Sequence, residues 1–338
     1  MSGSRPDLPE SIAGERTEDD ALLRRATGDG SLTLWSERFG EAFHSGLGAH
    51  AEAISKFVAP AQLQRFAAGT RLRVLDVCVG LGYNSAALLE AAEDRGLRIE
   101  WIGLELDPRP LALALADPGF RGLWRPSTVA ALEQLHNQGH WRSASGGSYG
   151  FWLLGDARQQ LEAVLQRWQG QCDLVLHDAF SPGHCPELWT VEFLGGLARL
   201  LQPEGRLLTY CAAAAVRRAL QLVGLELASI AAPISPGRDP NREQPRVWSA
   251  GTAASPSPLP TTTGEAGHGQ GEDIRPETVL RPLSAMERDH LLTRAAEPYR
   301  DPTGHADAAT IHRQRAERQQ LHTGESTSAW RRRWGLAR

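Results

Sequence analysis

Apolar runs and amphipathic stretches alternate through the middle of the chain. Amphipathic or Ala/Leu-rich stretches predict helices at 84–93, 109–116, 157–168, 187–201 and 212–223. Between them, short apolar runs that end at a turn or an acidic residue predict buried strands at 71–77, 98–104, 150–154, 172–177 and 205–211, with a last candidate at 245–249. This alternation predicts an α/β fold: a doubly wound, mostly parallel sheet with helices on both faces and ligands at the carboxyl ends of its strands.

Three other segments lack this alternation. Residues 1–28 are polar and predict a flexible leader, which leaves 29–250 as the α/β domain. Residues 251–276 are rich in Pro, Gly, Ser and Thr, and such a stretch buries too little apolar surface to offset its ordering entropy. We therefore expect a disordered linker or loop there. Residues 277–338 predict a helical, basic extension, with a charged helix at 310–320 that packs back on the domain.

Composition narrows the class of protein. Hydrophobic residues make up 41% of the chain, which excludes a wholly disordered protein. No apolar run approaches the roughly 18 residues of a membrane helix, and the polar, acidic start has no signal-peptide core, so we expect a cytoplasmic protein. The four cysteines show neither a disulfide framework nor zinc-ligand spacing, and no metal is expected.

Charge is distributed unevenly along the chain. The net charge of −4 excludes a uniformly basic nucleic-acid binder. Residues 281–338, however, carry eleven Arg against seven Asp and Glu, which leaves a polyanion contact open. The end of this region reads Trp330-Arg331-Arg332-Arg333-Trp334. Arginines flanked by aromatics suit phosphate contact with base stacking, and a frayed, solvated terminus is the alternative.

The turn after the first strand carries candidate cofactor residues. It runs from Asp76 through Gly80 and Gly82 into a helix, and glycines here let the backbone approach a ligand closely. The motif is not GxGxxG, because Cys78 and Ser85 occupy two of its glycine positions, and it lacks the Lys-Ser/Thr of a P-loop. A nucleoside ligand without phosphate, such as S-adenosylmethionine, is therefore favoured over a phosphate; a simple tight turn is the alternative.

Acidic residues follow the next two strands. Glu105 lies 23 residues after Gly82 and is placed to accept both hydroxyls of a ribose, or else to cap the following turn. Asp156, before Ala157, can accept a hydrogen bond from an adenine amino group or cap the next helix. Because all these acids are expected at one edge of the sheet, we favour the ligand roles.

The fourth strand ends in Asp178-Ala179-Phe180-Ser181-Pro182. This places an acid, an aromatic ring and a rigid turn where a methyl group would transfer. A carboxylate there can take the proton of an amine nucleophile or hold its lone pair on line, and Phe180 can flank the cationic centre. A strand-end turn with a buried Phe is the alternative. His184 and Cys185 lie nearby but lack the partners of a metal site or a nucleophile.

Several segments together resemble one family. They are the stretches 31–39, 43–49 with Glu52, 178–182 with 186–190, and 208–223 with Arg217, and there is a weaker echo at 298–302. Over residues 31–250 the chain resembles class I methyltransferases, and more narrowly the methyltransferase domain of MnmC-type tRNA wobble-uridine modification proteins. The resemblance implies a seven-stranded Rossmann-like sheet, S-adenosylmethionine as cofactor, and methyl transfer to the amine of 5-aminomethyl-(2-thio)uridine.

The resemblance also implies roles for individual residues and partners. The anticodon region of tRNA would be the substrate-bearing partner. No flavin-binding GxGxxG occurs in 250–338, so the oxidase half of bifunctional members is not expected and a separate enzyme would supply the amine. The cofactor would contact Asp76, Gly80, Gly82, Glu105, Asp156 and Ala157; Asp178 and Phe180 would be catalytic; His44, Ser45, Glu52 and Arg217 would contact the substrate.

Two other functions compete with this interpretation. A transferase acting on small amines, of the polyamine type, also uses an acid at the end of the fourth strand. A methyltransferase-like module could instead bind RNA or a protein without catalysis, although a loop with Gly80 and Gly82 beside three acids at strand ends argues against that.

Overall fold

A sheet of nine strands forms the centre of the computed structural model, which describes residues 21–46, 48–231, 249–261 and 279–336. Within the described residues its order is β12-β10-β11-β9-β8-β4-β5-β7-β6. The five parallel strands are β4 (Arg71–Val77), β5 (Arg98–Glu105), β7 (Tyr149–Leu154), β8 (Cys172–His177) and β9 (Leu201–Thr209). The antiparallel strands are β6 (His140–Arg142), β10 (Glu226–Ile230), β11 (Gly251–Ser255) and β12 (Leu280–Arg281).

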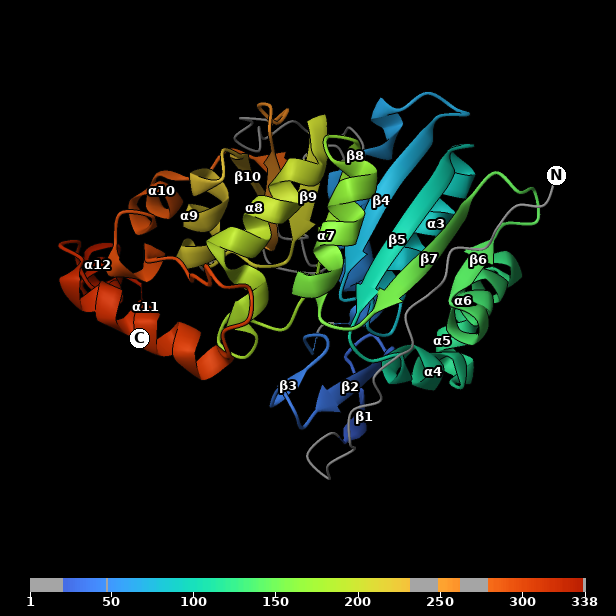
Figure 1. Ribbon diagram of the computed structural model, residues 1–338, viewed down its shortest axis with the longest axis horizontal. Helices are drawn as coiled ribbons and strands as arrows, with labels where there is room; N and C mark the ends of the chain where they lie inside the picture. The colour runs from blue at the N-terminus through green and yellow to red at the C-terminus, as the bar shows by residue number, and fades with distance from the viewer. Residues whose placement is uncertain (1–20, 47, 232–248, 262–278, 337–338) are drawn as a thin grey trace, which may run out of the picture.

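Helices cover both faces of this sheet (Figure 1). One face carries α7 (Ala157–Trp168), α8 (Val191–Leu200) and α9 (Ala214–Leu222), and the other carries α3 (Tyr83–Asp94) and α6 (Pro126–Gln138). Successive side chains of a strand point to opposite faces, so β4 contributes to two separate cores. Leu72 and Val74 pack in the core on the α3 side, and Leu75 and Val77 pack in the core on the α7 side. The predicted doubly wound, mostly parallel α/β sheet is confirmed, with β6 and β12 beyond the expected seven strands.

A second, three-stranded antiparallel sheet lies across the edge where the parallel strands end (Figure 1). Its strands are β1 (Leu22–Ala26), β2 (Leu32–Ser36) and β3 (Glu41–Ala42). The flexible leader expected over 1–28 is therefore wrong for 22–26, which pairs with 32–36 along its whole length. Residues 1–20 of the expected leader lie outside the described residues.

Short helices lie between the two sheets and in the connections between strands of the large sheet. A continuous helical run follows β3 and consists of α1 (Ala49–Glu52), the π-helical turn η2 (Ala53–Val58) and α2 (Ala59–Ala61). The remaining short elements are η3 (Leu63–Arg65), α4 (Arg109–Leu115), α5 (Pro118–Gly122) and η4 (Pro186–Trp189). Among the described residues, no helix is long and apolar enough to span a bilayer.

The linker expected at 251–276 begins inside the sheet. Residues 251–255 form β11, which lies between β10 and β9 and is buried at all five positions. Its small residues, Gly-Thr-Ala-Ala-Ser, give no apolar signal, yet Gly251 packs so closely that an added Cβ would lie 2.3 Å from the carbonyl oxygen of Thr209. The expected linker is therefore wrong at its start. Residues 262–276, and most of the candidate strand at 245–249, lie outside the described residues.

The C-terminal residues form α10 (Ala285–His290), η5 (Arg294–Ala296), α11 (Ala308–Leu321) and α12 (Thr327–Arg333). As expected, α11 packs back on the domain, with Ile311 fully buried.

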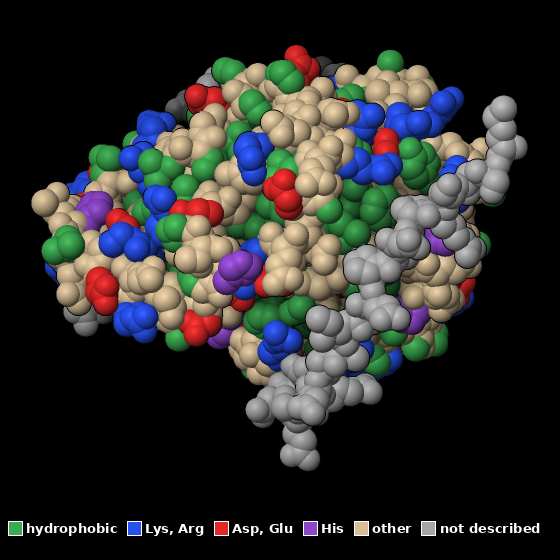
Figure 2. Space-filling model, in the orientation of Figure 1, with side chains coloured by type: hydrophobic (Ala, Val, Ile, Leu, Met, Phe, Trp, Pro, Cys, Tyr) green, Lys and Arg blue, Asp and Glu red, His purple; other side chains and the backbone are tan. Residues whose placement is uncertain are grey.

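The Trp/Arg segment at the end of the chain is ordered by contacts within this extension. Trp330 is fully buried and stacks on His290 with ring centroids 4.2 Å apart, and Trp334 Nε1 donates to Asp289 at 2.6 Å. A buried ring cannot stack on a base, so that expectation is wrong for Trp330, and so is the frayed terminus for α12. Figure 2 shows basic and acidic side chains interspersed over these helices on one face of the molecule.

Candidate active site

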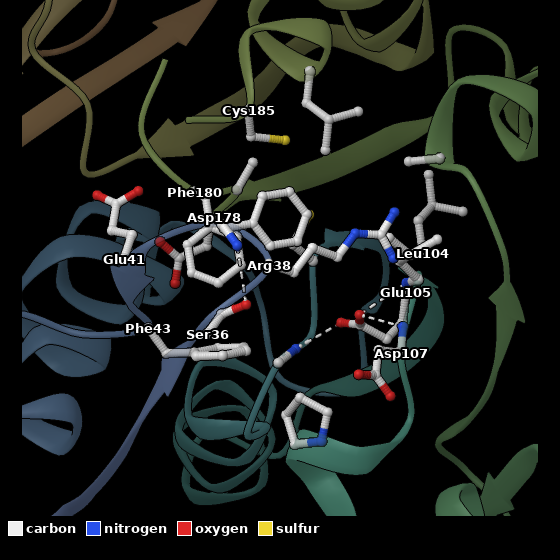
Figure 3. A pocket seen from close by; sticks show the side chains of 18 of the residues that line it. Ser36, Arg38, Glu41, Phe43, Leu104, Glu105, Asp107, Asp178, Phe180 and Cys185 are labelled. Atoms are coloured by element: carbon white, nitrogen blue, oxygen red, sulfur yellow. Dashed lines mark hydrogen bonds between the residues drawn. The ribbon is translucent and has the colours of Figure 1, made fainter. Parts of the chain in front are cut away.

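A cavity of about 450 Å³ lies where the parallel strands end, a size typical of small-molecule sites. The loop after β4 and the ends of β5, β7 and β8 form one side of it, and the segment 36–45 together with α1 and η2 forms the other. In Figure 3, Asp178 and Phe180 lie on one side of the cavity, and Glu105 and Asp107 lie on the other. The expected location, at the carboxyl edge of the sheet, is therefore correct.

The loop after β4 adopts a left-handed backbone twice within three residues. Cys78 has a φ of 67° and Gly80 a φ of 56°. A side chain at such an angle is strained, so Cys78 occupies a position that glycine would fill without cost. Gly80 lines the cavity, and its amide donates to Glu105 Oε2 at 2.8 Å. Gly82 instead caps α3 and packs against Leu111, and it is not among the cavity-lining residues.

Glu105 lines the cavity and organises two loops at once. Besides the Gly80 amide, its carboxylate accepts the amides of Leu106 at 2.8 Å and Asp107 at 2.9 Å. Burial raises the pKa of Glu105, and these three backbone donors oppose the shift. The capping interpretation is therefore correct for this residue, and its contact with a ribose stays a prediction.

Asp156 and Ala157 line the cavity from the start of α7. The Asp156 side chain accepts the Arg158 amide at 2.9 Å, so the helix-cap interpretation is correct, and it also pairs with the Arg158 guanidinium at 2.7 Å. Arg158 in turn reaches Asp301 at 3.1 Å and the Ala306 carbonyl at 2.9 Å. The weak sequence echo at 298–302 thus supports this wall of the cavity.

Asp76 does not reach the cavity. It is fully buried near the end of β4, where Ser85 of α3 donates a hydrogen bond to its Oδ2. Burial raises the pKa of Asp76 to about 7, and Asp178 and Glu105 add to the rise by repulsion. The residue therefore ties α3 to β4 and holds the glycine loop from behind, rather than lining the site.

Asp178 and Phe180 are placed by the turn after β8. The Asp178 amide donates to the Val77 carbonyl at 3.1 Å, and its Oδ2 accepts Asn84 Nδ2 at 2.7 Å. Burial raises the pKa of Asp178 to about 7. A carboxyl group with that pKa exchanges protons readily near neutral pH.

Phe180 belongs to an aromatic wall. Its ring stacks on Phe39 at 4.5 Å between centroids and meets the edge of Phe43 at 4.9 Å. Its carbonyl accepts Trp189 Nε1 at 2.7 Å, which fixes the turn. The alternative of a buried Phe in a plain turn does not describe this ring, because it lines the cavity.

His44, Ser45 and Glu52 all line the cavity, and their contact with a substrate stays a prediction. His44 Nδ1 lies 3.1 Å from Thr33 Oγ1, and burial lowers its pKa to about 4, so the ring is neutral at pH 7. Ser45 donates to Glu52, whose carboxylate pairs with Lys56 at 3.2 Å.

Sequence reasoning missed Phe39, Lys56 and Asn84 as site residues. Phe39 stood inside a stretch that carried the family resemblance, and Lys56 is the only lysine in the chain, so both had a signal. Asn84 had none beyond its place at the start of a helix.

Arg217 lies away from the cavity, which corrects the expectation that it contacts the substrate. It is 2% exposed on α9 and pairs with Glu287 of α10 at 3.0 Å. It also donates to Thr252 at 2.9 Å and to the Ser249 hydroxyl. A buried guanidinium needs such partners, and this network joins α9, β11 and α10. Within the described residues, no group of three or more His, Cys, Asp or Glu could hold a metal ion.

Comparison with known proteins finds methyltransferases among the proteins similar to this chain. Residues 151–232 match the family model of an S-adenosyl-L-methionine-dependent methyltransferase. The crystal structure of MNMC2 from Aquifex aeolicus superimposes with a TM-score of 0.67 at 26% identity, covering 90% of this chain and 87% of that one. The chain is thus similar to MnmC-type methyltransferases.

Curated relatives of this chain are longer than the part that it matches. An uncharacterized protein of Methanocaldococcus jannaschii is 30% identical over 214 residues, which are 63% of this chain and 56% of that protein. The tRNA 5-methylaminomethyl-2-thiouridine biosynthesis bifunctional protein MnmC of Cupriavidus necator is 32% identical over 200 residues, 57% of this chain and 30% of that protein. The chain thus spans about a third to a half of these relatives. The cofactor expected from the sequence, S-adenosylmethionine, agrees with the family model that residues 151–232 match.

Proposed function

We propose that this protein transfers the methyl group of S-adenosylmethionine to the exocyclic amine of 5-aminomethyl-(2-thio)uridine at the tRNA wobble position. The observation that carries the proposal is the pairing of two acids in one cavity. Asp178 faces it with a pKa of about 7, and Glu105 faces it from the opposite side. The Asp178 carboxylate suits the acceptor amine, and the Glu105 carboxylate suits the nucleoside of the methyl donor. Donor and acceptor therefore have separate places in the cavity.

The cofactor would lie along the ends of β4, β5 and β7. Glu105 would accept the ribose hydroxyls, and Asp156 with the Ala157 amide would face the adenine edge. Gly80 lets the backbone approach the bound molecule, while Gly82 and Asp76 hold the loop from behind. Bound there, S-adenosylmethionine would supply an electrophilic methyl group on a sulfonium.

The chain's own residues would then prepare the amine. Asp178 accepts the proton of the incoming ammonium group, and the hydrogen bond from Asn84 fixes which carboxylate oxygen faces the amine. Asp178 would pass this proton to water and become ionised again. The neutral nitrogen would then attack the methyl carbon as the carbon–sulfur bond breaks, which would leave a thioether and a methylammonium group. Holding the two reactants in line supplies much of the rate.

The aromatic wall has a matching role. Phe180 and Phe39 stack at 4.5 Å and stand beside Asp178, where a flat pyrimidine and a cationic sulfonium both gain from ring faces. Such a wall would receive a base that has left the anticodon stack. A free polyamine has no ring to use it.

The tRNA would approach over the small sheet. Leu22 of β1 lines the cavity, and Arg24 and Arg25 follow it on the same strand. Arg25 lies 4.1 Å over the ring of Trp35, which presents a cation and an aromatic surface together. Contacts with phosphates there would weaken as salt rises, because binding releases counterions.

Methyl transfer to isolated tRNA tests the proposal. Purified protein is incubated with labelled S-adenosylmethionine and tRNA from a strain that lacks this methylation, and the digested nucleosides are identified by mass spectrometry. Conversion of the aminomethyl to the methylaminomethyl nucleoside supports the proposal. Methylation of free polyamines with no response to tRNA would replace it with the small-amine reaction. Absence of both products despite cofactor binding would overturn the assigned acceptor.

A further inference from the structure

Lys56 shares the cavity with the carboxylate that would receive the amine. It lies on η2, lines the cavity together with Asp178, and pairs with Glu52 of α1 at 3.2 Å. Its ammonium stands 5.8 Å from the ring centroid of Tyr210. We propose that Lys56 is a positioning residue that keeps Asp178 ionised and the acceptor amine neutral. This inference rests on the proposed function, because it requires an amine acceptor.

The choice of residue is informative. Lys56 is the only lysine in a chain that otherwise uses arginine for every permanent positive charge. Lysine carries a compact point charge on a flexible stem, whereas arginine carries a broad planar fork. With 17% of its side chain exposed, Lys56 has limited room beside Glu52 and Tyr210. It also lies on a π-helical turn, a rare conformation that recurs at functional sites.

The titratable groups around Lys56 come from four other segments. Glu52 approaches from α1, Asp178 from the turn after β8, Tyr210 from the end of β9, and His44 from the segment after β3. Burial keeps His44 and Tyr210 uncharged near neutral pH, because it lowers the pKa of the former to about 4 and raises that of the latter. Only Lys56, Glu52 and Asp178 of this group therefore carry or exchange charge there.

Lys56 and Glu52 act in opposite directions on the pKa of Asp178. Lys56 lowers the pKa of Asp178 by attraction, and Glu52 raises it by repulsion. A second ammonium in the cavity is also disfavoured by Lys56, because like charges repel in a poorly hydrated site. Both effects of Lys56 favour a neutral amine beside an ionised Asp178, and hence a productive complex at lower pH.

The experiment measures single-turnover methyl transfer to aminomethyl-containing tRNA from pH 5.5 to 9 at saturating S-adenosylmethionine. The variants are Lys56→Met, Lys56→Arg and Glu52→Gln. For Lys56→Met we expect the acidic limb of the rate profile to move up by about one pH unit, the low end of the effect of a nearby charge. Lys56→Arg keeps the positive charge, so its acidic limb should stay at the wild-type pH, although its broader head should lower the rate. Glu52→Gln should move the limb in the opposite direction, to lower pH.

Opposite shifts from neighbouring residues are a result that a purely structural role would not produce. A loss of rate by the same factor at every pH, or shifts in one direction for both Lys56→Met and Glu52→Gln, would overturn the proposal. Should Lys56→Met fail to fold, as judged by thermal unfolding, the direction of the Glu52→Gln shift decides. Absence of transfer by the wild-type protein would overturn the proposed function itself, whereas an active wild type with unshifted variants would overturn the role of Lys56 alone.

Discussion

Asn84 Nδ2 donates a 2.7 Å hydrogen bond to Asp178 Oδ2, and this contact joins the start of α3 to the turn after β8. Asn84 lies in the first turn of α3, directly after the glycine loop, and Asp178 follows β8. The loop proposed to hold the cofactor and the carboxylate proposed to receive the amine are therefore held in one geometry. A shift in either element would change the alignment of donor and acceptor.

Replacing Asp178 separates chemistry from cofactor binding. We expect Asp178→Ala to lower the single-turnover rate by about 10²- to 10⁴-fold, the usual contribution of a positioned proton acceptor. Its affinity for S-adenosylmethionine, measured by calorimetry, should stay close to wild type, because the residues proposed to bind the cofactor lie at the ends of other strands. Asn84→Ala leaves the carboxylate in place, so its single-turnover rate should fall by a smaller factor. Equal losses of rate and affinity in Asp178→Ala would instead make Asp178 a cofactor ligand or a structural residue.

Replacing Glu105 should have the reverse effect. Glu105→Gln loses one acceptor oxygen and the negative charge, and hydrogen bonds to charged groups contribute roughly 1.5–3 kcal/mol. We therefore expect S-adenosylmethionine to bind at least tenfold more weakly, by calorimetry. Asp107→Asn is the matched control, because Asp107 also lines the cavity but pairs with Arg109 at 2.6 Å. An unchanged affinity in Glu105→Gln would remove Glu105 from the cofactor site.

Arg217 should matter for stability and not for the reaction. Arg217→Ala leaves Glu287 buried with Arg281 as its remaining cationic partner and removes the donor to Thr252 and Ser249. Breaking a buried pair costs about 3–5 kcal/mol, so we expect a loss of that size in urea unfolding. The adjacent Arg218→Ala, at an exposed position, should change the free energy of unfolding by less than about 0.5 kcal/mol. Comparable losses in the two variants would contradict the network.

The buried carboxyl of Asp76 should make stability depend on pH. Its pKa is raised to about 7 in the folded protein, against about 3.9 in an unfolded chain. The folded state therefore holds this proton more tightly. The resulting stabilisation is complete below about pH 4 and is lost as pH rises through 7.

Asp76→Asn removes that titration, while its amide oxygen can still accept from Ser85. In urea unfolding, the free energy of unfolding of the variant relative to that of wild type should be higher at pH 8 than at pH 5. A constant difference between the two proteins at both pH values would show that Asp76 does not titrate as described. The pKa of Asp178 is also raised to about 7, so we expect the stability of the variant to retain some dependence on pH.

Local signals predicted the main parallel strands and helices. The strands at 71–77 and 172–177 and the helix at 157–168 have the predicted bounds, because each is a short apolar run or an amphipathic stretch that ends at a turn or a cap. The acids at the strand ends were predicted to meet, and Glu105, Asp156 and Asp178 do line one cavity, since parallel strands end at the same edge of a sheet.

Two strands were missed because their own sequences carry no local signal. The strand at 251–255 consists of small residues, and only its place between β9 and β10 makes it a buried strand. The strand at 22–26 alternates little, and its pairing with 32–36 makes it part of a sheet. Burial in these cases is a property of the neighbours and not of the segment.

The sequence by itself determined the doubly wound α/β fold, the edge where the site lies and the acids at that edge, because strand periodicity and strand ends are local properties. Only the tertiary structure decided which side chains share the cavity. It turned Arg217 into an interior ion pair, placed Asp76 behind the glycine loop, and brought Lys56 and Asn84 to Asp178 from 122 and 94 residues away in the chain. Such contacts depend on how distant segments pack, and no pattern within either segment encodes the distance between them.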